Sequence, residues 1–160
     1  MAKRPQTKNL SPRIANRRAT HDYHISEKLE VGIVLRGSEV KSVRQGQVSL
    51  AEGYVMIDLK TEQLILSGVE ISRYLHAGQV QHETKRPRKL LAHKRQIRHL
   101  MGKTTAKGTT IVPLAMYFSR GLIKLEIGIG VGKKTYDKRQ DMKKREARRE
   151  IDRAMTRRRI

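Results

Sequence analysis

Short runs of apolar residues fill the middle of the chain, and most have the two-residue period of β-strands. The clearest run covers 122–130, whose evenly spaced apolar side chains are Ile123, Leu125, Ile127 and Ile129. Similar runs cover 31–35, 54–59, 64–66 and 109–118. Because only the polar residues 60–63 separate the runs at 54–59 and 64–66, these two predict a hairpin. We expect positions 69 and 71 to extend the same sheet.

The run at 109–118 contains a proline within an otherwise alternating pattern. The predicted apolar face comprises Val112, Leu114, Met116 and Phe118. Pro113 indicates an edge strand or a bulge, because proline cannot donate to a β-ladder. Ser119-Arg120-Gly121 is typical of a turn into the strand that follows.

Helical periodicity is confined to two segments before the C-terminal tail. The range 88–101 places Leu90, Leu91, Ile97, Leu100 and Met101 on one side and predicts a helix that stops at Gly102. A shorter helix is expected to begin with Ser38 as N-cap and Glu39 in its positive first turn, and to stop at Gly46. Residues 76–87 are polar and predict a loop. The fold class is therefore mainly β: a small, closed or nearly closed barrel of about six strands with two or three accessory helices and a basic C-terminal tail.

Charge divides the 160 residues into a more balanced centre and two basic ends. The 36 Lys and Arg residues against 15 Asp and Glu residues give a net charge of +21. Residues 1–20 hold six basic and no acidic side chains, and residues 133–160 hold thirteen basic and five acidic ones. This distribution predicts a flexible basic arm at 1–15, an RNA-binding barrel domain at 16–132 and a basic tail at 133–160. The partner that such a protein fits is a polyanion.

The tail is rich in helix-forming residues from position 137 onward but has few apolar side chains. Its thin apolar stripe consists of Ala147, Ile151, Ala154 and Met155. An isolated helix of about 20 residues is marginal in water without tertiary burial. We therefore expect the tail to be disordered alone and helical on a polyanionic surface.

Several classes of site are disfavoured by composition and spacing. The chain has no cysteine, which excludes a disulfide scaffold, a thiol nucleophile and cysteine-ligated metals. The six histidines lack zinc-site spacing, so neither a metal nor a cofactor is expected. Gly128-x-Gly130-x-Gly132 lacks the crossover helix of a dinucleotide site and instead suggests small residues at a flexible strand exit. No apolar run approaches the roughly 20 residues that cross a membrane, so no membrane partner is expected.

RNA binding is the function that remains, with two alternatives. The chain has only six aromatic residues, which favours recognition of folded RNA by shape and phosphate contacts over base stacking. A basic ribosomal structural protein that binds rRNA would have a similar composition. A nuclease that uses His21 or His24 is the second alternative.

Three sets of motifs carry a resemblance to a known family. The first is Asn16-Arg17-Arg18-Ala19-Thr20-His21-Asp22-Tyr23, followed by a segment from Glu30 that ends in Gly37-Ser38-Glu39-Val40-Lys41-Ser42. The second consists of Arg88-Lys89-Leu90-Leu91 and Val112-Pro113-Leu114, and the third is Gly132-Lys133-Lys134-Thr135-Tyr136-Asp137-Lys138-Arg139. From about residue 14 to the C-terminus, the chain resembles the SsrA-binding protein (SmpB) family of bacterial trans-translation.

This resemblance implies an oligonucleotide-binding-like barrel and a non-enzymatic adaptor that acts in the cytoplasm as a monomer. The barrel would bind the tRNA-like domain of tmRNA and deliver it to stalled ribosomes. The tail would occupy the decoding centre and the empty mRNA channel of the small subunit. A translational GTPase acting on the tmRNA complex is a further partner that the resemblance leaves open.

The resemblance also assigns residues to these two surfaces. The tmRNA face would comprise Asn16, Arg17, Arg18, His21, Tyr23, Glu30, Arg88, Lys89 and Leu90. The ribosome-binding tail would comprise Lys133, Lys134, Tyr136, Asp137, Lys138, Arg139, Lys143, Lys144, Arg145, Arg149 and Arg153. Glu30 is unexpected on an RNA-binding surface; it would either accept hydrogen bonds from base amino groups or anchor an arginine. The chain departs from the family pattern at His24, Pro87, Ala92 and Ala154.

Overall fold

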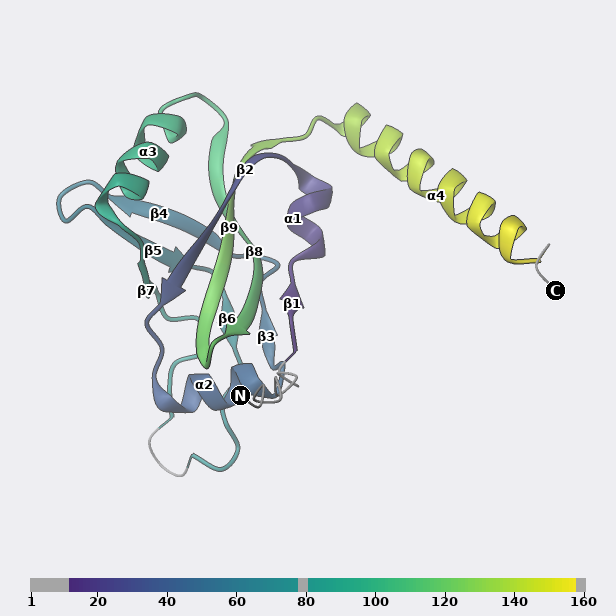
Figure 1. The fold of residues 1–160 in the computed structure, drawn as a ribbon. Coiled ribbons are helices and arrows are strands. Elements are labelled where there is room, and N and C mark those ends of the chain that lie inside the picture. Colours follow the sequence, from purple (N-terminus) through teal and green to yellow (C-terminus); the bar gives the residue numbers. More distant parts are fainter. Residues whose placement is uncertain (1–11, 78–80, 158–160) are drawn as a thin grey trace, which may run out of the picture.

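A computed structural model describes residues 12–77 and 81–157 of the chain (Figure 1). Most of the predicted arm, 1–11, lies outside the described residues, whereas Ile14 and Ala15 pair with a strand of the sheet. The strands are β1 (Ile14–Ala15), β2 (Tyr23–Ile33), β3 (Val48–Ser49), β4 (Tyr54–Asp58), β5 (Gln63–Ser67), β6 (Glu70–Ile71), β7 (Arg88–Leu91), β8 (Thr109–Ser119) and β9 (Leu122–Gly132). The helices are α1 (Arg17–Asp22), α2 (Gly37–Arg44), α3 (Lys94–Thr104) and α4 (Thr135–Arg157).

The large antiparallel sheet closes on itself, which confirms the mainly β fold class. Its strands follow the order β1-β8-β4-β5-β7-β2-β9, and β9 also pairs with β8. Six strands therefore form a closed ring, with β1 added to β8 outside it. Closure leaves no free edge in the ring, which protects these strands from pairing with other chains.

Alternating apolar residues of the strands fill the interior of the ring. The predicted face of β9 is confirmed, because Leu125, Ile127 and Ile129 are buried in the main core and Ile123 packs against it. The hairpin predicted between 54–59 and 64–66 is also confirmed as β4–β5, with Val55 paired to Leu66. The predicted turn at 119–121 joins β8 to β9, and its Arg120 and Gly121 adopt positive φ angles of 51° and 80°.

Two β-bulges move side chains from one face of the sheet to the other. One shifts the register of β2 between Ile25 and Glu27, and the other shifts β8 between Pro113 and Ala115. The prediction of a single apolar face on 109–118 is therefore wrong, whereas the bulge expected at Pro113 is confirmed. On β8, Leu114 belongs to a second cluster outside the ring, and Met116 lies in the main core.

The second cluster lies under α1, the short helix beside β8 in Figure 1. Ala19 of α1 is buried with Val112 and Leu114, and side chains at the start of β2 pack against them. A Cβ atom at Gly128 would lie 2.8 Å from a Leu114 methyl carbon, and one at Gly130 would lie 2.9 Å from Cβ of Tyr23. These two glycines are thus required for close packing within β9. The expected position of the glycines at the end of the strand is confirmed, because β9 ends at Gly132, and the flexible exit after it stays a prediction.

Two helices begin at other residues than the sequence predicts. Residues 88–91 form strand β7 between β5 and β2, so the helix predicted from residue 88 begins only at Lys94 and continues past Gly102 to Thr104. The alternation of buried Arg88 and Leu90 with exposed Lys89 and Leu91 is the two-residue period of a strand. In α2 the N-cap is Arg36 rather than Ser38.

The prediction that positions 69 and 71 extend the hairpin sheet is wrong. The short strand β6 contains Ile71 and pairs with β3 in a separate two-stranded sheet. The side chains of Val69 and Ile71 are nevertheless buried in the main core. Burial and sheet membership are therefore separate properties at these positions.

The predicted tail forms α4, which projects away from the barrel (Figure 1). Its first turn lies near the end of α1, and most of its side chains are exposed. The expectation that the tail is disordered before it meets RNA stays a prediction.

Candidate nucleic-acid interface

The residues predicted to contact tmRNA separate into buried and exposed positions. Asn16, Arg88 and Leu90 are buried, with exposures of 6%, 0% and 2%. The remaining residues lie on α1, on β2 and on the outward side of β7. The buried members therefore support the surface, and the exposed members form it.

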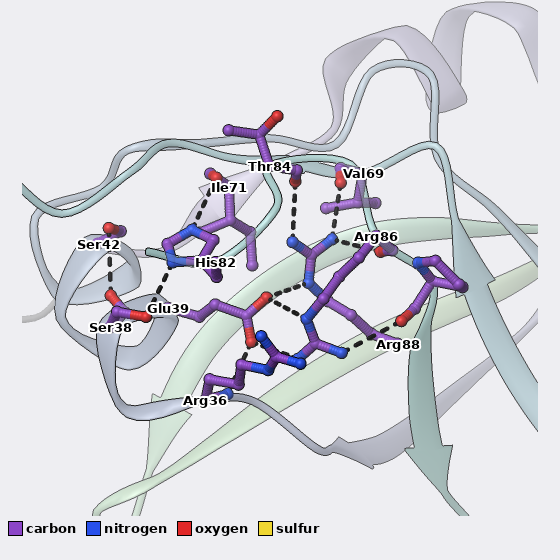
Figure 2. Close-up of polar contacts among 11 residues, drawn as sticks. Arg36, Ser38, Glu39, Ser42, Val69, Ile71, His82, Thr84, Arg86 and Arg88 are labelled. Atoms are coloured by element: carbon purple, nitrogen blue, oxygen red, sulfur yellow. Dashed lines mark hydrogen bonds and ion pairs between the residues drawn. The ribbon is translucent and has the colours of Figure 1, made fainter. Parts of the chain in front are cut away.

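Arg88 lies at the centre of a buried polar cluster (Figure 2). Its Nε donates to Oε1 of Glu39 at 2.8 Å, and its terminal nitrogens donate to the backbone oxygens of Val69 (2.8 Å), Thr84 (2.9 Å) and Arg86 (3.1 Å). The structure thus contradicts the placement of Arg88 on an RNA-facing surface. A strand position that points into the ring buries this guanidinium, and a carboxylate compensates its charge.

Glu39 is the shared acceptor of this cluster and is fully buried on α2. Besides Arg88, it accepts two bonds from the Arg86 guanidinium, at 3.0 and 2.5 Å, and one from the backbone N–H of Arg36 at 2.7 Å. Burial alone would raise the pKa of Glu39, but these hydrogen bonds outweigh it and lower the pKa. Glu39 is therefore a charged core residue that joins α2 to β7, and its place in the first turn of α2 is as predicted.

A histidine contact extends this cluster toward the N-terminal end of α2. The ring of buried His82 bonds the Ser38 hydroxyl at 2.9 Å and the backbone oxygen of Ile71 at 3.1 Å (Figure 2). Ser38 thus bonds a histidine of the loop before β7 instead of capping its own helix. This contact ties the loop to α2.

Asn16 fixes the position of α1 on the barrel. Its side-chain nitrogen donates to the backbone oxygens of Leu50 at 2.8 Å and Pro113 at 2.9 Å, and its oxygen accepts from the backbone N–H of Ala19 at 3.1 Å. All three bonds lie within the protein. Asn16 is thus the N-cap of α1 and a positioning residue for the exposed side chains that follow it.

The outward surface of α1 carries Arg17, Arg18 and His21. Arg17 and Arg18 are exposed, and Nδ1 of His21 bonds an oxygen of Asp22 at 2.9 Å. Tyr23 begins β2 beside them, and part of its surface packs against the cluster under α1. This end of the molecule therefore presents two guanidinium groups and an imidazole that phosphate oxygens or ribose hydroxyls can reach.

Glu30 lies on the outer face of the sheet, directly opposite Glu126 of β9. Two like charges across a strand pair repel each other unless cations compensate them. Here Arg13 and Lys28 pair with Glu126 at 2.6 and 3.5 Å, Lys124 pairs with Glu30 at 3.8 Å, and the Tyr117 hydroxyl donates to Glu30. This bond is the main reason that the pKa of Tyr117 rises to about 12.

A groove of about 550 Å³ lies next to Glu30, between β2, β7 and β9. Its lining combines polar and apolar side chains: Glu30, Leu91, His93, Gln96, Leu122 and Lys124. Leu91 is 52% exposed, whereas Leu90 is buried in the core. Sequence reasoning placed Leu90 on this surface, but the pleat of β7 puts its neighbour there.

Sequence reasoning also missed three residues of this region. Leu122 and Lys124 line the groove, and Lys28 pairs with Glu126 beside it. The alternation in β9 could have identified Lys124, because it lies between the buried positions of that strand. Lys28 follows the β2 bulge, which reverses the faces, so the sequence carried no simple signal for it.

The predicted tail residues are mostly exposed on α4 or just before it. Lys134, Tyr136, Arg139, Lys143, Lys144, Arg145, Arg149 and Arg153 are all exposed. Asp137 and Lys138 are half-buried, and Lys133 is largely buried with a side-chain exposure of 7%. Lys133 and Lys138 are the tail cations of this set whose side chains contact α1, and Lys133 is the more buried of the two.

Two kinds of site are not found in the described residues. No group of three or more His, Cys, Asp or Glu side chains within 12–77 and 81–157 could hold a metal ion. In the same part of the chain, no helix is long and apolar enough to cross a membrane.

Comparison with known proteins gives concordant results. The family model described as SmpB protein matches residues 13–157. An SsrA-binding protein of Carboxydothermus hydrogenoformans is 51% identical over 140 residues, which cover 88% of this chain and 93% of that protein. An SsrA-binding protein of Thermobifida fusca is 46% identical over 159 residues, or 98% of both chains. A solved structure described as "tmRNA-SmpB: a journey to the center of the bacterial ribosome" matches with a TM-score of 0.66 and 41% identity, over 78% of this chain and 87% of the other.

Proposed function

The chain belongs to the SmpB family, and from this we propose that it binds the tRNA-like domain of tmRNA and delivers it to stalled ribosomes for rescue by trans-translation. The observation that carries the proposal is the match over nearly the whole chain to SsrA-binding proteins, together with a structural match to a tmRNA–SmpB structure. The charge of +21 fits a partner made of RNA.

The tmRNA-binding surface that we propose extends from α1 to the groove beside Glu30. Arg17, Arg18 and His21 supply phosphate and hydroxyl contacts at one end, and Lys89 adds a cation on β7. At the groove, Leu91 and Leu122 offer apolar surface to unstacked bases, while Lys124 offers a cation. Glu30 is already engaged by Tyr117 and Lys124, so its role is to hold these two side chains in place rather than to anchor an arginine.

The tail contributes the second RNA surface, on the ribosome. We propose that Lys134, Tyr136 and Arg139 contact the decoding centre and that the cations from Lys143 to Arg153 follow the mRNA channel. Their side chains are exposed on α4, and a helix of 23 residues is about 35 Å long at 1.5 Å per residue. The tail can therefore reach RNA well beyond the barrel while the barrel holds tmRNA.

Both surfaces act by binding, so we propose an adaptor rather than an enzyme, working as a monomer in the cytoplasm where ribosomes are found. The division of labour is tested by truncation after Gly132. We expect the truncated chain to bind the tRNA-like domain of tmRNA with at least half of the full chain's affinity and to support no tagging of stalled nascent chains.

A matched control keeps the charge and composition of the tail and changes only the order of its amino acids. In this variant the sequence of residues 142–157 is scrambled, so its composition is unchanged. Tagging restored by the scrambled tail would show that charge alone suffices, and tagging by the truncated chain would contradict the proposed role of the tail.

A further inference from the structure

The first residues of the tail are fastened to the end of α1 by both backbone and side-chain bonds. The backbone N–H of Lys133 donates to the backbone oxygen of Asp22 at 2.8 Å. The Lys133 ammonium group donates to the backbone oxygen of Thr20 at 3.2 Å and to Oδ2 of Asp141 at 2.5 Å. Lys133 thus bridges α1 and the second turn of α4, and only 7% of its side chain is exposed.

Asp22 makes the reciprocal connection from α1 to the tail. Its Oδ1 atom lies 2.9 Å from the Lys138 ammonium group and 2.9 Å from Nδ1 of His21, and Oδ2 lies 3.5 Å from Nε of Arg18. The bonds from Lys138 and His21 lower the pKa of Asp22 to about 2. The carboxylate is therefore shared between a tail cation and two side chains of the α1 surface.

Helix geometry explains why two tail cations are held there. The C-terminal end of a helix carries partial negative charge from its unpaired carbonyl groups, and an acid at the last position adds to it. Asp22 is the last residue of α1, and the first turn of this helix has no acidic side chain. Lys133 on the Thr20 carbonyl and Lys138 on the Asp22 carboxylate neutralise this end. The two bridges leave from different residues of the tail, so together they restrict both the position and the rotation of the start of α4.

We propose that Asp22 and Lys133 are positioning residues that fix the direction in which the tail helix leaves the barrel. The functional part of this inference rests on the proposed function, because the tail must reach the ribosome while α1 faces tmRNA. Asp22 then links the two RNA surfaces: the carboxylate that holds Lys138 also contacts Arg18 and His21. Lys133 belongs to the barrel side of the tail, and we withdraw it from the residues that contact the ribosome directly.

Double electron–electron resonance between two spin labels on the full chain measures, without RNA, whether Asp22 and Lys133 hold α4 in one direction. The chain has no native cysteine, so labels attach only at introduced ones. Met56→Cys on β4 and Met142→Cys on α4 replace half-exposed side chains on either side of the connection. We expect a single narrow distance distribution in the otherwise unchanged chain and a clearly broader one after Asp22→Asn or Lys133→Met.

Two variants serve as controls for these changes. Lys134→Met removes a neighbouring cation that is exposed, and Glu70→Gln removes an acid on β6 while its partner Lys85 keeps Glu52. Both should leave the distribution narrow. A broad distribution in the unchanged chain, or equal widths in Asp22→Asn and Glu70→Gln, would overturn the proposal.

Tagging at saturating tmRNA gives the functional readout. We expect Asp22→Asn to slow tagging about fivefold relative to Glu70→Gln, the size of effect that loss of coupling between two sites produces. Equal tagging rates would overturn the functional part of the proposal. If the unchanged chain bound no tmRNA, the proposed function would fail instead, and the distance measurement would still decide whether Asp22 and Lys133 hold the tail.

Discussion

Replacement of Arg88 by methionine separates a structural role from an RNA-binding one. Arg88 is part of a motif that the resemblance places on the tmRNA surface, yet its side chain is fully buried. Methionine has a similar length and no charge, so the substitution removes the hydrogen bonds while it keeps much of the volume. Because the side chain is buried, the variant should lose stability and keep the RNA affinity of its folded fraction.

The expected loss follows from the four bonds that Arg88 donates. One goes to the buried Glu39 carboxylate, and three go to backbone oxygens of Val69, Thr84 and Arg86. Removal of one partner from a buried ion pair costs about 3–5 kcal/mol, because the remaining charge and acceptors are left without full compensation. Arg86 still pairs with Glu39, which places the expected loss near the lower end, at about 3 kcal/mol. Small domains have total stabilities of about 5–15 kcal/mol, so a folded population should remain.

The assay is urea unfolding followed by circular dichroism, combined with tmRNA binding under conditions where each variant is folded. Lys89→Met is the matched control on the same strand: its side chain is exposed, so we expect a stability change within about 0.5 kcal/mol and weaker RNA binding. Arg88→Lys keeps the charge and provides a second variant if the methionine variant does not fold. A stability change below about 1 kcal/mol for Arg88→Met, with a tenfold loss of affinity, would refute the assignment of Arg88 to the core.

Three further predictions concern the packing and titration of single residues. Gly128→Ala should destabilise the fold by about 1–3 kcal/mol in urea unfolding, since its Cβ would meet Leu114 at 2.8 Å, whereas Gly102→Ala, with nothing within 4 Å, should not. Tyr117 should ionise near pH 12 in an NMR titration, and Glu30→Gln should return the pKa of Tyr117 toward 10. The stability that the hydrogen bond from Tyr117 to Glu30 provides is present below about pH 10 and is lost as the pH rises toward 12. The lowered pKa of Asp22 should contribute stability above pH 4 that is lost as the pH falls toward 2, and because the ion pairs lie at the surface we expect no more than about 1 kcal/mol. The difference in unfolding free energy between the unchanged chain and Asp22→Asn should shrink over that range, and a constant difference would contradict this prediction.

Most of the longer strands could be predicted because their side chains alternate between a buried face and a more exposed one. Leu125, Ile127 and Ile129 identify β9 directly, and the hairpin between β4 and β5 follows from two apolar runs with a short polar connection. Bulges broke the same reasoning on β8, because one extra residue moves the next side chain to the opposite face. A pattern of period two carries no signal for the position of such an insertion.

The candidate surface was predicted less well than the fold, for reasons that particular residues make clear. Leu90 and Leu91 are equally apolar in sequence, and only the pairing of β7 with its neighbours decides which one is exposed. Arg88 and Lys133 look like surface cations in the sequence. The burial of Arg88 depends on Glu39, which is 49 residues away, and that of Lys133 depends on Asp141, which is eight residues further along the chain. Pairings of this kind arise from tertiary structure and cannot be derived from local periodicity.

We propose that the chain recognises the tRNA-like domain of tmRNA by shape and not by charge alone. The most direct test is a binding competition across a salt titration, in which the labelled tRNA-like domain competes with ordinary tRNA and with rRNA fragments. We expect a preference for the tRNA-like domain that persists as the salt concentration is raised and nonspecific phosphate contacts weaken. Equal affinities that fall together with salt would contradict it and would favour a basic ribosomal protein that binds rRNA.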